Sequence, residues 1–99
     1  MRPPIERLRK KVQKENLWFF ILCLLEKRGM YAFKIRNAIK EEFGFLSGNV
    51  TAYKVLYLLE RGRYVKKTID GNKTYYRITG KGKDQLKMAR KFFVEMEKL

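Results

Sequence analysis

Apolar residues at the start of the chain recur at spacings of three and four residues, which predicts helical structure there. The repeating positions are Ile5, Leu8, Val12, Phe19, Leu22 and Cys23. One helix over about residues 4–28 accounts for them, and a division at Asn16 is the alternative because Asn favours helix caps over interiors. The second part of this segment is apolar nearly all round, which places it in the core or at a subunit interface.

Two further segments with the same spacing predict helices over about residues 31–43 and 49–61. The apolar stripes are Ala32, Ile35, Ala38, Ile39 and Phe43 in the first segment, and Ala52, Val55, Leu56 and Leu59 in the second. Gly44 and Gly62 follow as C-terminal stops, since glycine tolerates the left-handed conformation that often ends a helix.

The period then changes to two residues, which predicts strands over residues 64–69 and 73–78. Residues 70–72 between them read Asp-Gly-Asn, which is typical of a tight hairpin turn. Thr79 is the expected N-cap of a last helix over about residues 80–97. The apolar seam of that helix consists of Leu86, Ala89, Phe93 and Met96.

The charge balance indicates an anionic partner. The chain has 24 Lys and Arg residues and 10 Asp and Glu residues, a net charge of +14. Residues 1–46 carry eleven basic and five acidic side chains, residues 47–83 nine and two, and residues 84–99 four and three. Such an excess points to nucleic acid or an anionic membrane, with a solvated lysine-rich surface as the plain alternative. A membrane-spanning helix is disfavoured, because the apolar run of residues 17–25 is far shorter than the ~20 residues that span a bilayer. Membrane insertion is disfavoured, because the apolar stripe of residues 5–12 is narrow and bears no aromatic residue.

The helix over residues 49–61 is the candidate reader of DNA, because a helix fits the major groove and its N-terminal residues reach base edges. The candidate contact residues are Asn49, Thr51, Tyr53, Lys54 and Tyr57. Asn pairs with adenine, Thr contacts thymine, Lys reaches guanine, and tyrosines contact phosphate or sugar. Ser47 or Asn49 is expected to cap the helix. An ordinary surface helix is the alternative.

The hairpin is the candidate wing, because it carries a row of cations with Asp70 as its single acid. The cations are Lys66, Lys67, Lys73 and Arg77. Such a ribbon can lie against the phosphate backbone or probe the minor groove, and a charged edge that discourages aggregation is the alternative.

These elements indicate a mainly α fold with a two-stranded β-hairpin, namely a winged helix-turn-helix followed by a C-terminal dimerisation helix. We assign residues 1–79 to DNA binding and residues 80–99 to dimerisation. The seam of the last helix is too apolar to leave in water, and the surface around Trp18 and Phe19 is the natural one to meet it in a homodimer. Packing of the whole seam within one chain is the alternative.

The chain has few residues of the types that commonly act in catalysis, since it has no histidine, one cysteine (Cys23) and one serine (Ser47). No nucleophile–base pair, transition-metal ligand set or glycine-rich phosphate loop emerges, so we expect neither an enzyme nor a cofactor or metal. The lone cysteine and the lack of a signal peptide favour the reducing cytoplasm.

Three parts of the sequence resemble the PadR family of winged-helix regulators. Residues 21–25 (ILCLL) and 29–35 (GMYAFKI) look like that family's apolar first helix and the entry to its second. Residues 51–60 (TAYKVLYLLE) are similar to its recognition-helix signature, and residues 75–82 (YYRITGKG) resemble the end of its wing.

The resemblance implies a homodimer in which the C-terminal helix packs on the first helix of the other subunit, and repression by operator binding. It also implies, in some members, a small aromatic or cationic effector near the dimer centre, where Trp18 is a candidate lining residue. Two departures stand out: Tyr31 and Ala32 replace the usual His-Gly, and the glycine of the helix-to-wing junction, Gly62, comes one residue early.

The predicted function is therefore that of a sequence-specific regulator of transcription that binds double-stranded DNA as a homodimer. A non-specific architectural DNA-binding protein and a winged-helix module that binds another protein are the alternatives.

Overall fold

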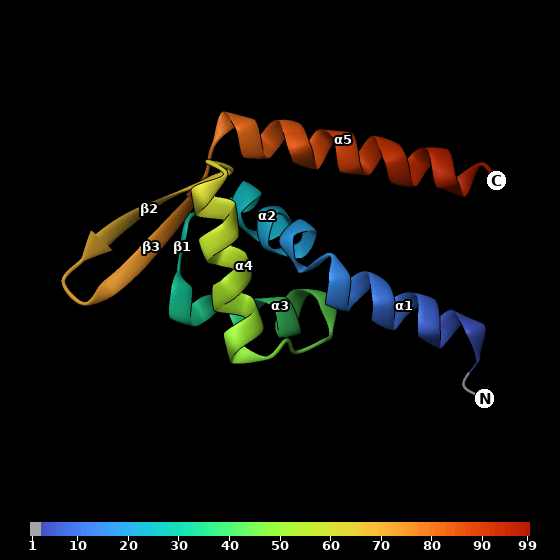
Figure 1. Cartoon of the computed structure of the whole chain (residues 1–99), viewed down its shortest axis with the longest axis horizontal. Helices are drawn as coiled ribbons and strands as arrows, with labels where there is room; N and C mark the ends of the chain where they lie inside the picture. The colour runs from blue at the N-terminus through green and yellow to red at the C-terminus, as the bar shows by residue number, and fades with distance from the viewer. Residues whose placement is uncertain (1–2) are drawn as a thin grey trace.

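The computed structural model describes residues 3–99 and follows the predicted order of elements with one additional strand (Figure 1). The elements are α1 (Pro4–Glu15), α2 (Leu17–Lys27), β1 (Met30–Tyr31), α3 (Ala32–Phe43), α4 (Asn49–Arg61), β2 (Val65–Asp70), β3 (Lys73–Ile78) and α5 (Gly80–Glu97). The hairpin of β2 and β3 projects to one side, while α1 and α5 extend to the other. The predicted winged helix-turn-helix is thus confirmed. The hairpin marks one end of the molecule, and α1 and α5 form the other.

The first apolar segment forms two helices, because Asn16 between them has φ −124° and ψ 36°, outside the helical region. The predicted division at Asn16 is confirmed, and a single helix over residues 4–28 is wrong. The two helices differ in burial. No residue of α1 is buried, whereas α2 contributes the buried side chains Leu17, Ile21, Leu22, Leu24 and Leu25.

The strand β1 was not predicted from the sequence, which placed Tyr31 at the start of a helix. Met30 pairs with Tyr76 and Tyr31 with Tyr75, both antiparallel, so the sheet has three strands in the order β1-β3-β2. A strand of two residues is too short to show a period, and its pairing partner lies far along the chain. The local pattern therefore carried no signal for β1.

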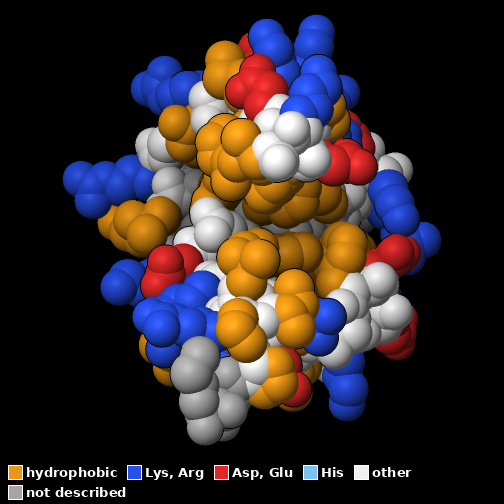
Figure 2. All heavy atoms as spheres, turned by 90° about the vertical axis from the view of Figure 1, so that its right-hand side faces the viewer, with side chains coloured by type: hydrophobic (Ala, Val, Ile, Leu, Met, Phe, Trp, Pro, Cys, Tyr) orange, Lys and Arg blue, Asp and Glu red, His pale blue; other side chains and the backbone are white. Residues whose placement is uncertain are grey.

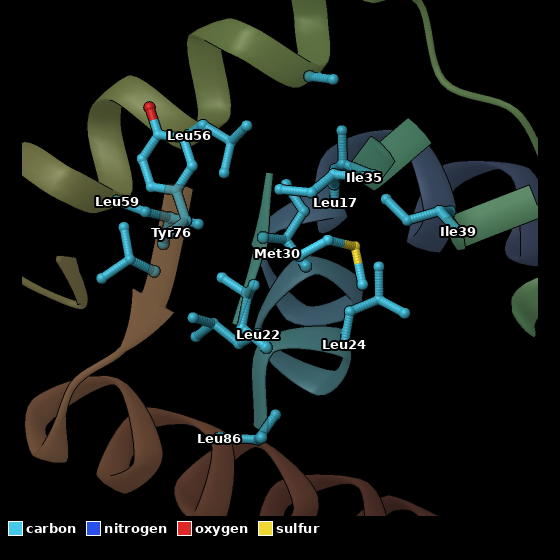
Figure 3. Packing of buried hydrophobic residues seen from close by; sticks show 14 residues of the cluster. Leu17, Leu22, Leu24, Met30, Ile35, Ile39, Leu56, Leu59, Tyr76 and Leu86 are labelled. Atoms are coloured by element: carbon cyan, nitrogen blue, oxygen red, sulfur yellow. The ribbon is translucent and has the colours of Figure 1, made fainter. Parts of the chain in front are cut away.

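The core forms around α2, onto which α3, α4, the sheet and α5 pack (Figure 3). The largest fully buried side chains are Ile21, Leu22, Leu25, Ile35, Ile39, Leu56 and Leu86. Leu86 points from α5 toward α2 in Figure 3 and is fully buried, so it anchors α5 to the core of its own chain. The stripes predicted for α3 and α4 face this core through Ile35, Ile39, Ala52, Leu56 and Leu59, and their remaining members are half-buried.

Thr79 forms the predicted N-cap of α5 and also ties this helix to the base of the hairpin. Its hydroxyl accepts a hydrogen bond from the N–H of Gly82 at 3.1 Å and lies 2.7 and 3.0 Å from the carbonyl oxygens of Arg63 and Tyr64. The N–H of Thr79 donates to the Tyr64 carbonyl at 3.1 Å. A Cβ at the buried position Gly82 would overlap that carbonyl, so only glycine fits this close approach. The hairpin and α5 therefore join without a flexible linker.

Arg63, at the junction of α4 and β2, has φ 65°, in the left-handed region. A non-glycine residue pays about 1–2 kcal/mol for this conformation. The sequence has glycine one position earlier, at Gly62, where φ is −77° but a Cβ would meet the Tyr64 ring at 2.5 Å. The early glycine at the helix-to-wing junction thus leaves a strained arginine at the position that favours glycine.

Candidate nucleic-acid interface

Helix α4 turns one face to the core and presents the opposite face to solvent. Ala52, Leu56 and Leu59 are buried, which fixes the rotation of the helix about its axis. All five predicted contact residues are consequently exposed, namely Asn49, Thr51, Tyr53, Lys54 and Tyr57. An exposed helix face that begins with short polar side chains has the dimensions and donors to enter a major groove.

The N-terminus of α4 differs from the prediction, because neither Ser47 nor Asn49 caps it. Gly48 is the N-cap residue, no side chain accepts a hydrogen bond there, and Ser47 Oγ is buried without a partner among the described residues. The first-turn N–H groups of α4 are therefore left for an outside acceptor. Helix N-termini bind phosphate groups for this reason, since their N–H groups and dipole favour an anion.

Arg36, on α3, holds the start of α4 and was missed by the sequence analysis. Its Nε donates to the carbonyl of Ser47 at 2.8 Å, and its Nη1 donates to Oδ1 of Asn49 at 3.2 Å. The second bond turns the amide nitrogen of Asn49 away from Arg36, where it can donate to an acceptor on a base. The two residues lie 13 apart in the chain, so no local pattern links them.

Val50 was also missed, although it is the centre of the exposed face. Its side chain is 82% exposed on the first turn of α4, between the predicted contact residues Asn49 and Thr51. The predicted contacts on this helix were polar and tyrosine side chains only. The helical period alone would have found Val50, because it lies opposite the buried residue Leu59 on a helical wheel.

The hairpin divides the four predicted wing cations between its two faces. Lys66 pairs with Arg77 and shares a face with Lys73, whereas Lys67 pairs with the core residue Tyr76 and shares the other face. All four cations are exposed. Like charges directly opposite each other, as at Lys66 and Arg77, destabilise a sheet. A bound polyanion would relieve this repulsion.

Aromatic side chains brace the hairpin against β1. The Tyr31 hydroxyl donates to Asp70 Oδ2 at 3.0 Å, and its ring meets that of Tyr75 edge-on at 5.0 Å. Lys73 Nζ lies 5.8 Å from the ring centres of both Tyr31 and Phe33. Hydrogen bonding to Asp70 raises the pKa of Tyr31, so the phenol stays protonated as a donor at neutral pH. Asp70, the single acid of the wing, thus helps to hold the hairpin against β1.

Helices α1 and α5 form the other exposed region, which we call the apolar cleft. Its exposed side chains are Ile5 and Leu8 of α1 and Met88, Phe92, Phe93 and Met96 of α5. Figure 2 looks onto this side of the molecule, where hydrophobic side chains gather in the middle and Lys and Arg lie around the rim. Surface of this composition is typical of a protein–protein contact.

The predicted dimerisation residues fall into three environments. Phe93 and Met96 are exposed, at 40% and 49%, whereas Trp18, Phe19 and Ala89 are half-buried. The Phe19 ring packs edge-on against Phe93 at 5.1 Å and against Trp18 at 6.0 Å. Leu86 is fully buried within its own chain and has no surface to offer a partner.

A bidentate ion pair fixes α5 beside α2 next to this cluster. Nη1 and Nη2 of Arg90 donate to the two carboxylate oxygens of Glu26, both at 2.9 Å. Hydrogen bonding by Arg90 holds the pKa of Glu26 below its ordinary value of 4.5. Cys23 lies beside the pair, and burial raises the pKa of its thiol, which keeps it protonated and unreactive.

Residues 3–99 contain no cluster of three or more metal-ligating side chains. No helix in the same range is long and apolar enough to cross a bilayer.

A family model described as "Transcriptional regulator PadR-like family" matches residues 21–88. A transcriptional regulator from Clostridium thermocellum is similar in structure, with 25% identity, a TM-score of 0.81, and coverage of 89% of this chain and 92% of that one. A PadR family transcription regulator from Clostridium difficile has 25% identity and a TM-score of 0.74, with 82% and 90% covered.

Bacillus subtilis PadR, solved in complex with operator DNA, is 30% identical with a TM-score of 0.60. The match covers 71% of this chain but 42% of that longer one. No curated protein sequence matches this chain.

Proposed function

This chain belongs to the PadR-like family of transcriptional regulators, and on that premise we propose that it binds double-stranded DNA sequence-specifically as a homodimer and represses transcription. One observation carries the proposal. The segment from α4 through the hairpin presents five exposed contact residues and four exposed cations on adjoining elements. Residues 47–83, which include this segment and the first turn of α5, have nine basic and two acidic side chains.

Helix α4 enters the major groove in this proposal, and the hairpin follows the backbone beside it. Asn49, Thr51 and Lys54 contact base edges, since these side chains match donors and acceptors displayed there. Tyr53 and Tyr57 contact phosphate or sugar. The wing cations, Lys66, Lys67, Lys73 and Arg77, contact phosphates and supply affinity that does not depend on sequence.

The homodimer forms through the apolar cleft, with residues 80–99 as the dimerisation helix and residues 1–79 as the DNA-binding unit. Trp18, Phe19, Ala89, Phe93 and Met96 form the contact surface, and Leu86 supports it from within. Two features support this assignment: α1 buries none of its residues within its own chain, and α5 leaves its aromatic face exposed. A small-molecule effector at the dimer centre stays a prediction.

Selection of binding sites from random duplex DNA, run at two salt concentrations, tests the proposal. We expect a pseudo-palindrome with half-sites about 10 bp apart, because a two-fold dimer reads one face of the duplex. A reporter with this site upstream should lose expression when the protein is present. Equal binding to all duplexes with a steep salt dependence would instead indicate an architectural protein. Salt-insensitive binding to another protein, with little DNA retained, would indicate an interaction module.

A further inference from the structure

Val50 is an apolar residue on the exposed face of α4, where the candidate contact residues are polar. It is 82% exposed, more than any large hydrophobic residue in the described chain except the terminal Leu99. Val50 lies outside the apolar cleft and shares its helix face with Lys54 and Tyr57. Burial in the core of its own chain does not explain a valine at this position.

The surroundings hold Val50 in one place. The carbonyl of Gly48 accepts a hydrogen bond from the N–H of Ala52 at 3.0 Å, which closes the first turn of α4 around Val50. Arg36 fixes the residues on the N-terminal side through Ser47 and Asn49. A β-branched side chain in a helix is also stiff at χ1. Its two methyl groups are thus presented in a fixed position at the tip of the helix.

The major groove offers one apolar group to such a side chain. Of the four bases, only thymine carries a methyl group, at C5, and the other base edges present hydrogen-bond donors and acceptors. A valine placed against those polar edges would desolvate them without providing a hydrogen bond, which disfavours binding.

From this geometry we infer that Val50 is a specificity-determining residue that requires the C5-methyl of a thymine in each half-site. The inference rests on the proposed function, since it needs α4 in the major groove. Val50 and the thymine methyl bury apolar surface against each other, while the Asn49 amide donates to an acceptor on a neighbouring base. The recognised class of ligand is a duplex with a thymine facing the first turn of α4.

Replacement of thymine by deoxyuridine tests the inference, because it removes only the methyl group. Each thymine of the selected site is replaced in turn, and the dissociation constant is measured for the wild type and for Val50→Ala. We expect one position per half-site at which the wild type binds about fourfold more weakly, as for the loss of one buried methyl group. Val50→Ala should bind thymine and uracil alike at that position.

Leu58→Ala is the matched control, because Leu58 is a second exposed apolar residue of α4, two turns further along. It should keep the wild-type ratio between thymine and uracil. The same ratio in the wild type and Val50→Ala at every position would overturn the inference and leave sequence-specific binding intact, as would a selected site with no thymine in the half-site. A selection that returns no preferred sequence would overturn both.

Discussion

The two ends of this molecule expose side chains of opposite character, polar and charged at one end and apolar at the other. At one end, α4 and the hairpin present Asn49, Lys54 and the wing cations on a framework fixed by hydrogen bonds from Arg36 and Tyr31. At the other end, α1 and α5 present apolar side chains, and the Arg90–Glu26 ion pair holds α5 beside α2. The first surface is rigid and charged, and the second is apolar and incompletely packed.

The difference supports the proposal of two kinds of partner. Unrelieved positive charge calls for a polyanion, whose binding weakens as salt rises. Exposed apolar surface calls for another protein surface, whose binding depends little on salt. Variants at each end should therefore separate DNA affinity from self-association, and the following expectations are ordered by size.

Phe92→Asp should have the largest effect, because Phe92 lies on the exposed apolar face of α5. Burial of an unpaired carboxylate costs about 3 kcal/mol or more, which corresponds to about a hundredfold weaker dimer. Sedimentation velocity at micromolar concentration should show a monomer with unchanged helix content. Lys87→Asp, on the opposite face of α5, is the control and should stay dimeric. A dimeric Phe92→Asp protein would place the interface elsewhere.

Asn49→Ala should cost about 1–3 kcal/mol of discrimination at one base position, as expected for the loss of a base-edge contact. Affinity for random duplex should change little. Competition assays with single-base variants of the selected site measure this difference. Because Arg36 positions Asn49, Arg36→Leu combined with Asn49→Ala should lose less than the sum of the single variants. Additive losses would show that Arg36 does not act through Asn49.

Lys67→Ala should weaken binding to all duplexes alike by several-fold. It should also reduce the slope of log affinity against log salt by about one unit, because one phosphate contact is lost. Titrations at four salt concentrations give this slope. Lys87→Ala removes a lysine at the other end of the molecule and should leave the slope unchanged. A change in sequence preference alone would show that Lys67 contacts a base.

Arg63→Gly should stabilise the fold by about 0.5–1 kcal/mol, since relief of the left-handed strain exceeds the entropy that glycine adds to the unfolded chain. Thermal unfolding should shift upward by a few degrees. Gly62→Ala, at a neighbouring position with negative φ, should instead destabilise the fold, because its Cβ would overlap the Tyr64 ring. A lower melting temperature for Arg63→Gly would mean that the Arg63 side chain stabilises the junction.

The smallest effect concerns the Arg90–Glu26 ion pair. Because the folded-state pKa of Glu26 is lowered, its contribution to stability is present above the ordinary value of 4.5 and is lost as pH falls through the folded pKa. The pair is largely exposed, so the contribution is well below about 1 kcal/mol. Unfolding in urea between pH 7 and pH 3 should show a smaller acid-induced loss for Glu26→Gln than for the wild type. Equal losses would assign this pH dependence to other carboxylates.

Local patterns in the sequence predicted most of the fold and most of the residues that α4 and the hairpin expose. The stripes of α3 and α4, the hairpin turn and the Thr79 cap each depend on a few neighbouring residues, and the structure confirms them. What the sequence missed involves distant residues. β1 pairs with β3 across the chain, and Arg36 reaches Asn49 from another helix.

The misses at the candidate site also had a chemical cause. The start of α4 was expected to carry a polar cap, but Gly48 occupies that position and leaves Ser47 buried. Val50 was overlooked because it lies outside the apolar stripe of α4 and has no hydrogen-bonding group. The distribution of wing cations over two faces required the register of β2 against β3, which a run of lysines does not reveal.

The direct joint at Thr79 has a consequence for operator architecture. Gly82 and Thr79 hold α5 against the residues that begin the wing. The two DNA-binding units of the proposed dimer therefore have a fixed spacing and a fixed rotation relative to each other. One inserted base pair moves a half-site by about 3.4 Å and turns it by roughly 34–36° around the duplex axis. No flexible segment lies between the DNA-binding unit and the dimerisation helix to absorb that change, so the DNA would have to twist instead.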